Sequence, residues 1–237
     1  MGAQWKHAGR VSNSSKRGAL VSKLVKEIAV AAKMGDPNPD NNPRLRAGVE
    51  SAKKASVPRD TIERAIKKGA GLTDETVQYE SVLYEGFAPH RVPVIVECLT
   101  DNKNRTAADI RVLFRKGQLG SVAWLFDHMG VVEATLAQPQ VDIEEVAIEA
   151  GAQNVEPLEP EEVSAGSSGA RFFTETKDLD SVSKSLTQRG WTVTLSEMSY
   201  QVKAPVELGE SEKKEVVEFL AQVDEHDDVH RIYTAIR

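Results

Sequence analysis

The stretch SEKKEVVEFLAQVDEHDDVHRIYTAI, residues 211–236, decides the topology that the preceding chain must have. Its first half has the pattern of a helix, and its end, DVHRIYTAI, has the pattern of a strand. One helix and one strand cannot build a stable core by themselves. We therefore expect them to complete a sheet that begins earlier in the chain.

The incomplete sheet lies in the middle of the sequence. YESVLYEGFA (79–88) and VPVIVECLTD (92–101) are predicted strands, and NRTAADIRVLFRKG (104–117) is a predicted helix. SVAWLFDH (121–128) is predicted as a third strand. This strand–strand–helix–strand unit needs the last helix and strand of the chain to become a complete domain.

A second set of elements separates the two halves of that domain. Residues 130–203 have the order β-α-β-β-α-β, which is the split βαβ or ferredoxin-like pattern. The predicted strands are 130–136, 152–159, 170–176 and 191–202, and the predicted helices are 141–151 and 178–190. Residues 130–203 are thus predicted to be an insertion, which makes the domain around them discontinuous.

The beginning of the chain is predicted to be all-helical. Apolar residues recur every three to four positions in 15–34, and Gly35 with the prolines that follow ends this helix. Asn42 is a good N-cap with Pro43 at the first helical position, and a third helix ends at Gly69 and Gly71. The predicted fold class is α+β with three domains, namely 1–76, 77–129 plus 204–237, and the inserted 130–203.

Charge is divided unevenly along the 237 residues, which have a net charge of −6. Residues 1–72 contain 15 Lys and Arg against 6 Asp and Glu, a net charge of +9, whereas residues 73–237 contain 15 against 30, a net charge of −15. This asymmetry predicts a polyanion-binding module joined to an acidic body. The alternative is that these cations only make the helices soluble.

The predicted nucleic-acid-binding residues lie mostly off the apolar faces of these helices. They are Trp5, Lys6, Arg10, Lys16, Arg17, Lys23, Lys26, Arg44, Arg46, Lys53, Lys54, Arg59, Arg64, Lys67 and Lys68, with Asn104 and Arg105 as an additional edge from the second domain.

Two of these assignments have a plain structural alternative. TDNKNRT (100–106) can be a polar recognition edge, or its Asn and Asp residues can simply cap the following helix. Trp5 lies among cations and can stack on a base, or it can anchor the N-terminal tail in a groove.

No catalytic or cofactor-binding pattern emerges from the chain. HDDVH (226–230) resembles a metal-binding cluster, but we interpret it as a solvated turn entering a strand, because the two histidines need a helix to converge. Cys98, the one cysteine, lies in an apolar run and is interpreted as a core residue. We expect no metal, no cofactor, no small-molecule substrate and no membrane span.

Several motifs resemble the YebC/PmpR family, which includes the mitochondrial translational activator of cytochrome c oxidase subunit I. They are KRG (16–18), KLVKEIAVAAKMG (23–35), NPRLRAGVESAKKASVPRDTIERAIKKG (42–69) and YEGFAP with VPVIVECLTDNKNRTAADIR (84–111). The resemblance implies a helical domain followed by two α/β domains. The chain departs from the family pattern before Trp5, at His90 and Arg91, where relatives tend to have glycines, and in a shortened loop before residue 121.

The resemblance also implies a function. The family is labelled as probable DNA-binding transcriptional regulators, and some members resemble translation factors that act at the ribosome. We expect a cytoplasmic, non-enzymatic regulator that binds nucleic acid, either DNA or ribosomal RNA, and whose acidic domains can contact basic ribosomal proteins. A protein–protein adaptor with a basic domain is the remaining alternative.

Overall fold

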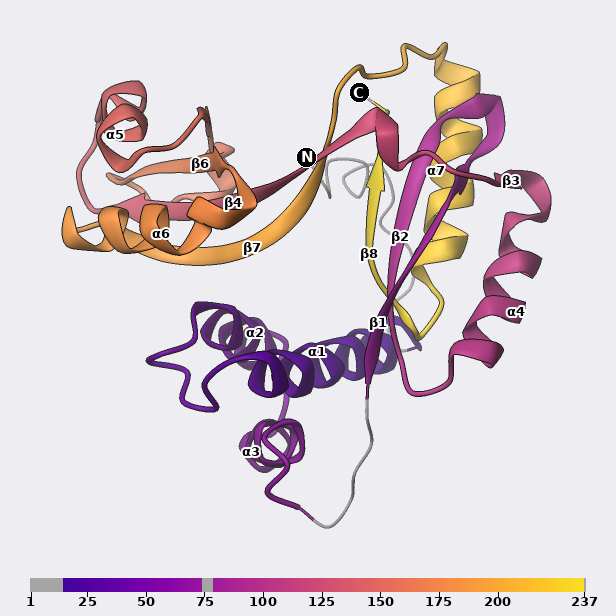
Figure 1. Ribbon diagram of the computed structural model, residues 1–237, viewed down its shortest axis with the longest axis horizontal. Helices are drawn as coiled ribbons and strands as arrows, with labels where there is room; N and C mark the ends of the chain where they lie inside the picture. Colours follow the sequence, from indigo (N-terminus) through magenta and orange to yellow (C-terminus); the bar gives the residue numbers. More distant parts are fainter. Residues whose placement is uncertain (1–14, 74–78, 237) are drawn as a thin grey trace. The chain divides into compact units, whose positions relative to one another are not determined.

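The computed structural model describes residues 15–73 and 79–236 (Figure 1). Its contacts divide the chain into two compact units, Met1–Asp127 with Gln201–Arg237, and His128–Tyr200. Within the described residues the fold is α+β, a helical region followed by two antiparallel sheets. The predicted fold class is confirmed, whereas the limits 1–76, 77–129 plus 204–237, and 130–203 stay a prediction.

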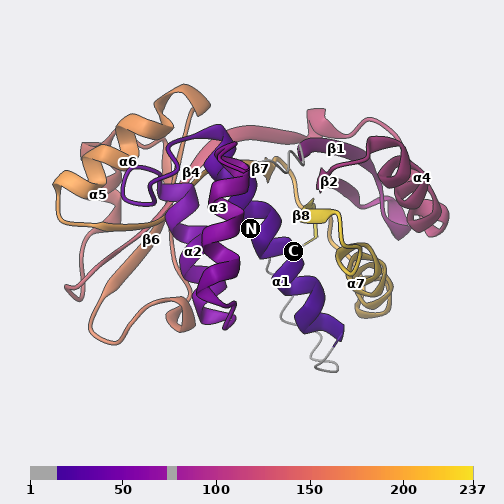
Figure 2. The same cartoon turned by 90° about the horizontal axis from the view of Figure 1, so that it is seen from below.

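The first unit begins with three helices, α1 (Ser15–Met34), α2 (Pro43–Lys54) and α3 (Arg59–Gly69). Both α2 and α3 pack against α1, as Figure 2 shows. Ile28 of α1, Leu45 and Ala52 of α2, and Ile62 and Ala65 of α3 are buried in one core. The periodic apolar residues of the sequence therefore meet in a shared interior.

Two local contacts fix the positions of these helices. The Asn42 side chain accepts a hydrogen bond from the Leu45 amide and donates two of 2.9 Å, to the carbonyls of Ala31 and Asp36. The predicted N-cap is thus confirmed and also ties α2 to the end of α1. At the end of α3, a Cβ on Gly69 would lie 2.1 Å from the Ala29 carbonyl oxygen, so only glycine permits this approach.

The rest of the first unit is a four-stranded sheet with the order β3-β1-β2-β8. Its strands are β1 (Glu80–Phe87), β2 (Pro93–Thr100), β3 (Gln118–Leu119) and β8 (Val229–Thr234). The helices are α4 (Lys103–Leu113) and α7 (Glu210–Asp224), with short 3₁₀ turns η2 (Pro89–Arg91), η3 (Phe114–Lys116) and η4 (Ala123–Leu125). The C-terminal strand pairs antiparallel with β2, so the chain returns to the sheet it left.

The helices α4 and α7 cover the face of this sheet that presents Val94, Val96 and Cys98 (Figure 1). Phe114 and Phe219 meet edge to face within this core, with their ring centroids 5.3 Å apart. Successive side chains of a strand point to opposite faces, so Glu85, Phe87 and Glu97 belong to the other face. The contacts of Glu85 and Phe87 on that face are described below.

The second unit contains the sheet β5-β6-β4-β7. Its elements are β4 (Phe126–Leu136), α5 (Ile143–Ala150), β5 (Asn154–Pro157), η5 (Pro160–Glu162), β6 (Ser168–Thr174), η6 (Thr176–Asp178), α6 (Leu179–Gln188) and β7 (Thr192–Val202). Phe172 and Trp191 lie in its core, together with Val182 and Leu186 of α6. Both the element order and the strand order are those of the ferredoxin-like fold.

The predicted strand 121–128 is wrong over its first half. Residues 123–125 form the turn η4, and the regular strand begins only at Phe126. The cause is Glu85 of β1, whose Oε2 accepts hydrogen bonds of 2.7 Å from the amides of both Val122 and Ala123. The Glu85 carboxylate thus accepts the hydrogen bonds that these two amides would otherwise donate to a neighbouring strand.

Replacing Gly69 by Ala tests the close approach of α3 to α1. The added methyl group forces backbone apart, and we expect the free energy of unfolding to fall by about 1–3 kcal/mol. Gly18→Ala in α1 is the matched control, because nothing lies within 4 Å of its Cβ position. Alanine favours a helix interior by up to about 1 kcal/mol, so the control should unfold at the same or higher urea concentration. Equal urea midpoints for the two variants contradict this packing.

Candidate nucleic-acid interface

Two lysines end α2 on its solvent-facing side. Leu45, Val49 and Ala52 are buried against α1, which turns the side chains of Lys53 and Lys54 to the solvent. No carboxylate of the described residues lies within ion-pair distance of either lysine. Both side chains are therefore available to an external anion.

The helix α3 repeats this arrangement. Ile62 and Ala65 face the core, while Arg64 and Lys67 are exposed and Lys68 is half-buried. Lys67 and Lys68 stand in the last turn of α3, as Lys53 and Lys54 do in α2. The structure thus brings the predicted lysines to the surface as two pairs, each at the carboxyl end of a helix.

These positions also have an effect on stability. Positive side chains at the carboxyl end of a helix interact favourably with the helix dipole, by roughly 0.3–1 kcal/mol for each. This contribution is small and does not need two adjacent lysines at each end. A binding test on these residues must nevertheless be accompanied by a stability measurement.

Four other predicted cations are already engaged within the first unit. Lys23 donates to the Asp224 carbonyl, and Lys26 lies 2.6 Å from Asp228. Arg44 pairs with Glu27 at 2.7 Å. Arg46 donates to the carbonyls of Pro39 and Asp40, which close the loop before α2.

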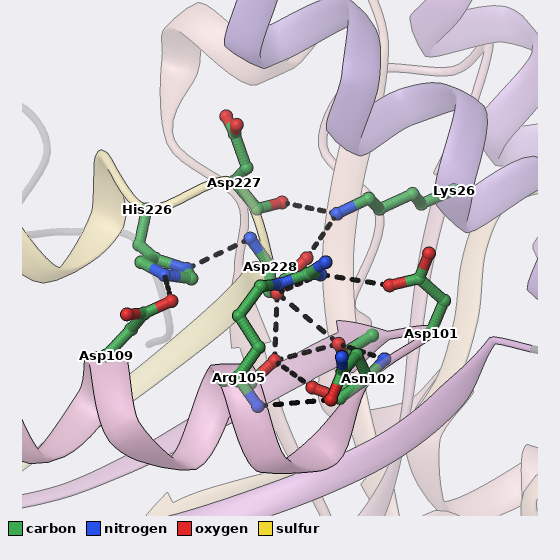
Figure 3. Close-up of polar contacts among 10 residues, drawn as sticks. Lys26, Asp101, Asn102, Arg105, Asp109, His226, Asp227 and Asp228 are labelled. Carbon is green, nitrogen blue, oxygen red and sulfur yellow. Dashed lines mark hydrogen bonds and ion pairs between the residues drawn. The ribbon is translucent and has the colours of Figure 1, made fainter.

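The partner of Lys26 is the centre of a buried polar cluster, drawn in Figure 3. The Asp228 side chain is 4% exposed, and its Oδ2 lies 2.8 Å from Thr106 Oγ1, 3.0 Å from an Arg105 nitrogen and 3.3 Å from Thr100 Oγ1. Burial alone raises the pKa of this carboxyl, but hydrogen bonds from Lys26, Arg105 and Thr106 outweigh burial and hold the pKa well below its usual range. Asp228 is therefore ionised and structural.

The side chains around His226 complete the cluster. The His226 Nδ1 accepts a hydrogen bond of 3.1 Å from the Asp228 amide, and its Nε2 lies 3.2 Å from Asp109 of α4 (Figure 3). Residues 226–228 do form a turn that enters β8 at Val229, as predicted, but the turn is not solvated throughout, because Asp228 is buried. No group of metal-binding side chains is found anywhere in the described residues.

Glu27, on α1, is a second buried charge besides Asp228. It is 6% exposed and lies 2.7 Å from Arg44 and 2.9 Å from the Nε2 of His230 on β8. Burial raises the pKa of Glu27, but the His230 and Arg44 side chains outweigh it and hold the pKa well below its usual range. Sequence reasoning missed this residue. Its position inside the apolar run KEIAVAA was the available signal.

Most residues of the predicted recognition edge, TDNKNRT (100–106), make contacts that stabilise the fold. Asn102 caps α4 by accepting from the Arg105 amide at 3.1 Å. Arg105 bonds Asp101 at 2.9 Å as well as Asp228. Asn104 is exposed on the first turn of α4. Helix capping thus explains much of TDNKNRT.

The described residues contain no arrangement suited to covalent catalysis. Cys98 is fully buried in the core of the first sheet, and burial raises the pKa of its thiol to about 12. A thiol that stays protonated at neutral pH is a poor nucleophile. No helix among the described residues has the length and apolar character to cross a membrane.

Comparison with known proteins identifies the family. The sequence profile described as the N-terminal domain of TACO1/YebC proteins matches residues 3–72, and the profile of their second and third domain matches residues 79–236. The chain belongs to the TACO1/YebC family. The YebC resemblance inferred from the sequence motifs is thereby confirmed.

Relatives match this TACO1/YebC chain over its full length. A protein of Pseudomonas syringae pv. tomato is 52% identical, covering 100% of this chain and 99% of its own. One of Bdellovibrio bacteriovorus is 48% identical, covering 100% of both. Both are named probable transcriptional regulatory proteins. The crystal structure of a conserved hypothetical protein from Aquifex aeolicus aligns with a TM-score of 0.74 at 36% identity, covering 98% of this chain and 96% of that one.

The remaining candidates of this TACO1/YebC protein are placed as follows. Trp5, Lys6 and Arg10 lie outside the described residues. Lys16 and Arg17 lie in the first turn of α1. Arg59 pairs with Glu63 one turn further along α3, in an exposed i,i+4 contact of 2.7 Å. An exposed pair of this kind contributes little to stability, so Arg59 stays accessible to a stronger anion.

Asp228→Asn tests the buried cluster. Removing one partner of a buried ion pair leaves the others uncompensated, and we expect a loss of about 3 kcal/mol in the free energy of unfolding at neutral pH. Because the folded pKa is lowered, the stability that Asp228 contributes is present above the unfolded pKa of about 3.9 and is lost as the pH falls below it.

Melting temperatures measured from pH 7 down to pH 3 check both points. The variant should have a shallower fall with pH than the wild type. The exposed neighbour Asp227 supplies the control, since Asp227→Asn should change stability by less than about 0.5 kcal/mol. Parallel pH curves for wild type and Asp228→Asn contradict the assignment.

Proposed function

We propose that this protein is a nucleic-acid-binding regulator, and specifically a DNA-binding transcriptional regulator that grips phosphates through its helical region. The observation that carries the proposal is the set of lysines at the ends of α2 and α3, of which Lys53, Lys54 and Lys67 are exposed, in a region with a net charge of +9. Lysine and arginine that meet phosphates release condensed counterions, which drives binding to any nucleic acid. The names of the relatives support a regulatory role.

The expected mode of binding is backbone contact. Lys53, Lys54 and Lys67 lie on two helices, so the cations are spread over several helices and are not concentrated on one recognition helix. Phosphate contacts position a protein on a duplex without reading its sequence. The acidic remainder, with a net charge of −15, repels nucleic acid over most of its surface and thereby favours contact at the helical region.

The same observation favours a second candidate, a translation factor that binds ribosomal RNA. A surface that grips phosphates without reading bases suits a structured RNA as well as a duplex. In that case the acidic domains contact basic ribosomal proteins. In either case the proposed site of action is the cytoplasm, and no catalytic step is involved.

Sedimentation with ribosomes separates the two candidates. The protein is centrifuged through sucrose with purified ribosomes at low and moderate salt, with mixed duplex DNA as competitor. Cosedimentation that survives moderate salt and resists DNA establishes the translation factor. Its absence, together with salt-sensitive duplex binding in a gel shift, establishes the DNA-binding regulator. The absence of both refutes nucleic-acid binding.

Replacing Lys53, Lys54, Lys67 and Lys68 by Glu should abolish binding of duplex DNA and of ribosomes. The reason is that four phosphate contacts become repulsive, while no buried group is lost. We expect the melting temperature to fall by roughly 15 °C at most, because the four helix-end contacts together contribute about 1–4 kcal/mol, so the variant stays folded at the assay temperature. Fluorescence anisotropy with a labelled duplex, at several salt concentrations, measures the affinity.

The control must carry the same change in net charge. Lys177, Lys184, Lys213 and Lys214 are exposed outside the helical region, and their replacement by Glu shifts the total charge equally. This control should bind within about threefold of the wild type. Equal losses in both variants indicate a nonspecific charge effect, and unchanged affinity in the first variant refutes the basic-surface proposal.

A further inference from the structure

Trp124 is an exposed aromatic residue on a fixed turn. It belongs to η4, and 67% of its surface is open to the solvent. Glu85 holds the turn through the amides of Val122 and Ala123, and its own carbonyl accepts from the Gly120 amide at 3.1 Å. A single exposed apolar residue is common on protein surfaces, so the case for a binding role rests on the cations that lie around this turn.

A lysine adjoins this turn from a distant part of the chain. Lys203 donates its Nζ to the Trp124 carbonyl at 3.1 Å and its amide to the Leu125 carbonyl at 3.0 Å. Its side chain remains 50% exposed, and its one carboxylate contact among the described residues, with Asp127, is 3.4 Å long. A cation is thereby fixed beside the backbone of Trp124, with N–H donors left for a ligand.

The strained turn η2, called the corner below, places another cation, Arg91, on the same sheet face. His90 and Arg91 of η2 both have a φ of 59°, the left-handed region that favours glycine. Such strain persists only where contacts hold it and is concentrated at functional positions. Here His90 lies 2.9 Å from Glu215, and Arg91 lies over the Phe87 ring at 5.5 Å.

The corner and the turn lie close together on the sheet. Phe87 and Glu85 are two residues apart on β1 and therefore share a face, roughly 7 Å from each other along the strand. Gly120 also approaches Phe87, since its Cβ position is 3.9 Å from the ring. Arg91 and the turn that carries Trp124 thus flank one short edge of β1.

We propose that Trp124, Lys203 and Arg91 form a stacking site for an unpaired base of single-stranded nucleic acid. We call these three residues the Trp124 edge. The indole stacks on the base, and the two cations contact the flanking phosphates. An exposed aromatic ring with cations on either side is how proteins bind single strands without reading their sequence.

Charge complementarity favours a nucleic-acid strand as the occupant. The acidic part of the chain has only 15 cations against 30 carboxylates, yet Arg91, Arg115, Lys116 and Lys203 are all exposed near β3 and η4. Only Gly117 separates Arg115 and Lys116 from Gln118, which pairs with Phe87. The site adds an unpaired-strand contact to the proposed function and rests on it, because both require a polyanionic partner.

The test measures the affinity of the full chain for a labelled, unstructured 15-nucleotide strand of RNA or DNA by fluorescence anisotropy. A second strand of equal length and charge, with every base removed, serves as the stacking-free probe. We compare wild type, Trp124→Ala and Trp124→Phe, with Leu83→Ala as the control. Leu83 is another exposed apolar residue of the first unit, 43% exposed on β1.

Stacking by one base corresponds to about a tenfold loss of affinity in Trp124→Ala for the natural strand. Trp124→Phe should stay within about threefold, Leu83→Ala should bind as the wild type does, and the abasic strand should not distinguish the variants. Unchanged affinity in Trp124→Ala overturns the inference. So does an equal loss for both strands, or an inability of the wild type to bind the natural strand. If the true occupant of this site is an acidic protein, Trp124→Ala should bind the strand as the wild type does, which is the first of these contradicting outcomes.

Failure of this inference can be told from failure of the proposed function. If the fourfold Lys→Glu variant of α2 and α3 loses binding while Trp124→Ala does not, only the Trp124 edge is refuted. If Trp124→Ala loses binding while the fourfold variant keeps it, the edge stands and the basic-surface proposal falls.

Discussion

The buried carboxylate of Asp228 is the interaction on which the first unit depends. A charge that is 4% exposed is costly unless other groups neutralise and hydrogen-bond it. Lys26 supplies the neutralising charge from α1, Arg105 and Thr106 contribute from α4, and the Asp228 carbonyl accepts from the Leu99 amide on β2. One residue thereby joins the first helix, the middle of the chain and the entry to its last strand.

The cluster also decides which cations are available to a partner. Lys23, Lys26 and Arg44 appeared equivalent to the other basic residues, yet their contacts with Asp224, Asp228 and Glu27 satisfy them inside the unit. Lys53, Lys54 and Lys67, at the ends of α2 and α3, have no carboxylate within ion-pair distance among the described residues. The structure therefore separates the internal cations from these exposed lysines, on which the proposed function rests.

The two proposed surfaces have different physical characters. The lysine pairs act through long-range charge, so their effect should weaken steeply with salt and be indifferent to base identity. The Trp124 edge depends on a rigid turn, held by a carboxylate, and on stacking, which salt screens far less. A protein with both can hold a duplex or folded RNA by its phosphates and still respond to a base that has left the stack.

The sequence by itself determined the helices, their caps and the inserted ferredoxin-like pattern, because these features depend on residues only a few positions apart. Asn42 with Pro43 marked the start of α2, and an orphan helix and strand at residues 211–236 indicated a sheet that the chain leaves and rejoins. Only the tertiary structure decided which charges are internal, since Lys26 and Asp228 are 202 positions apart. It also turned residues 123–125 from a predicted strand into a turn, because Glu85 arrives from another strand to bind their amides. Local patterning cannot reveal such partners, which become neighbours only when the sheet closes.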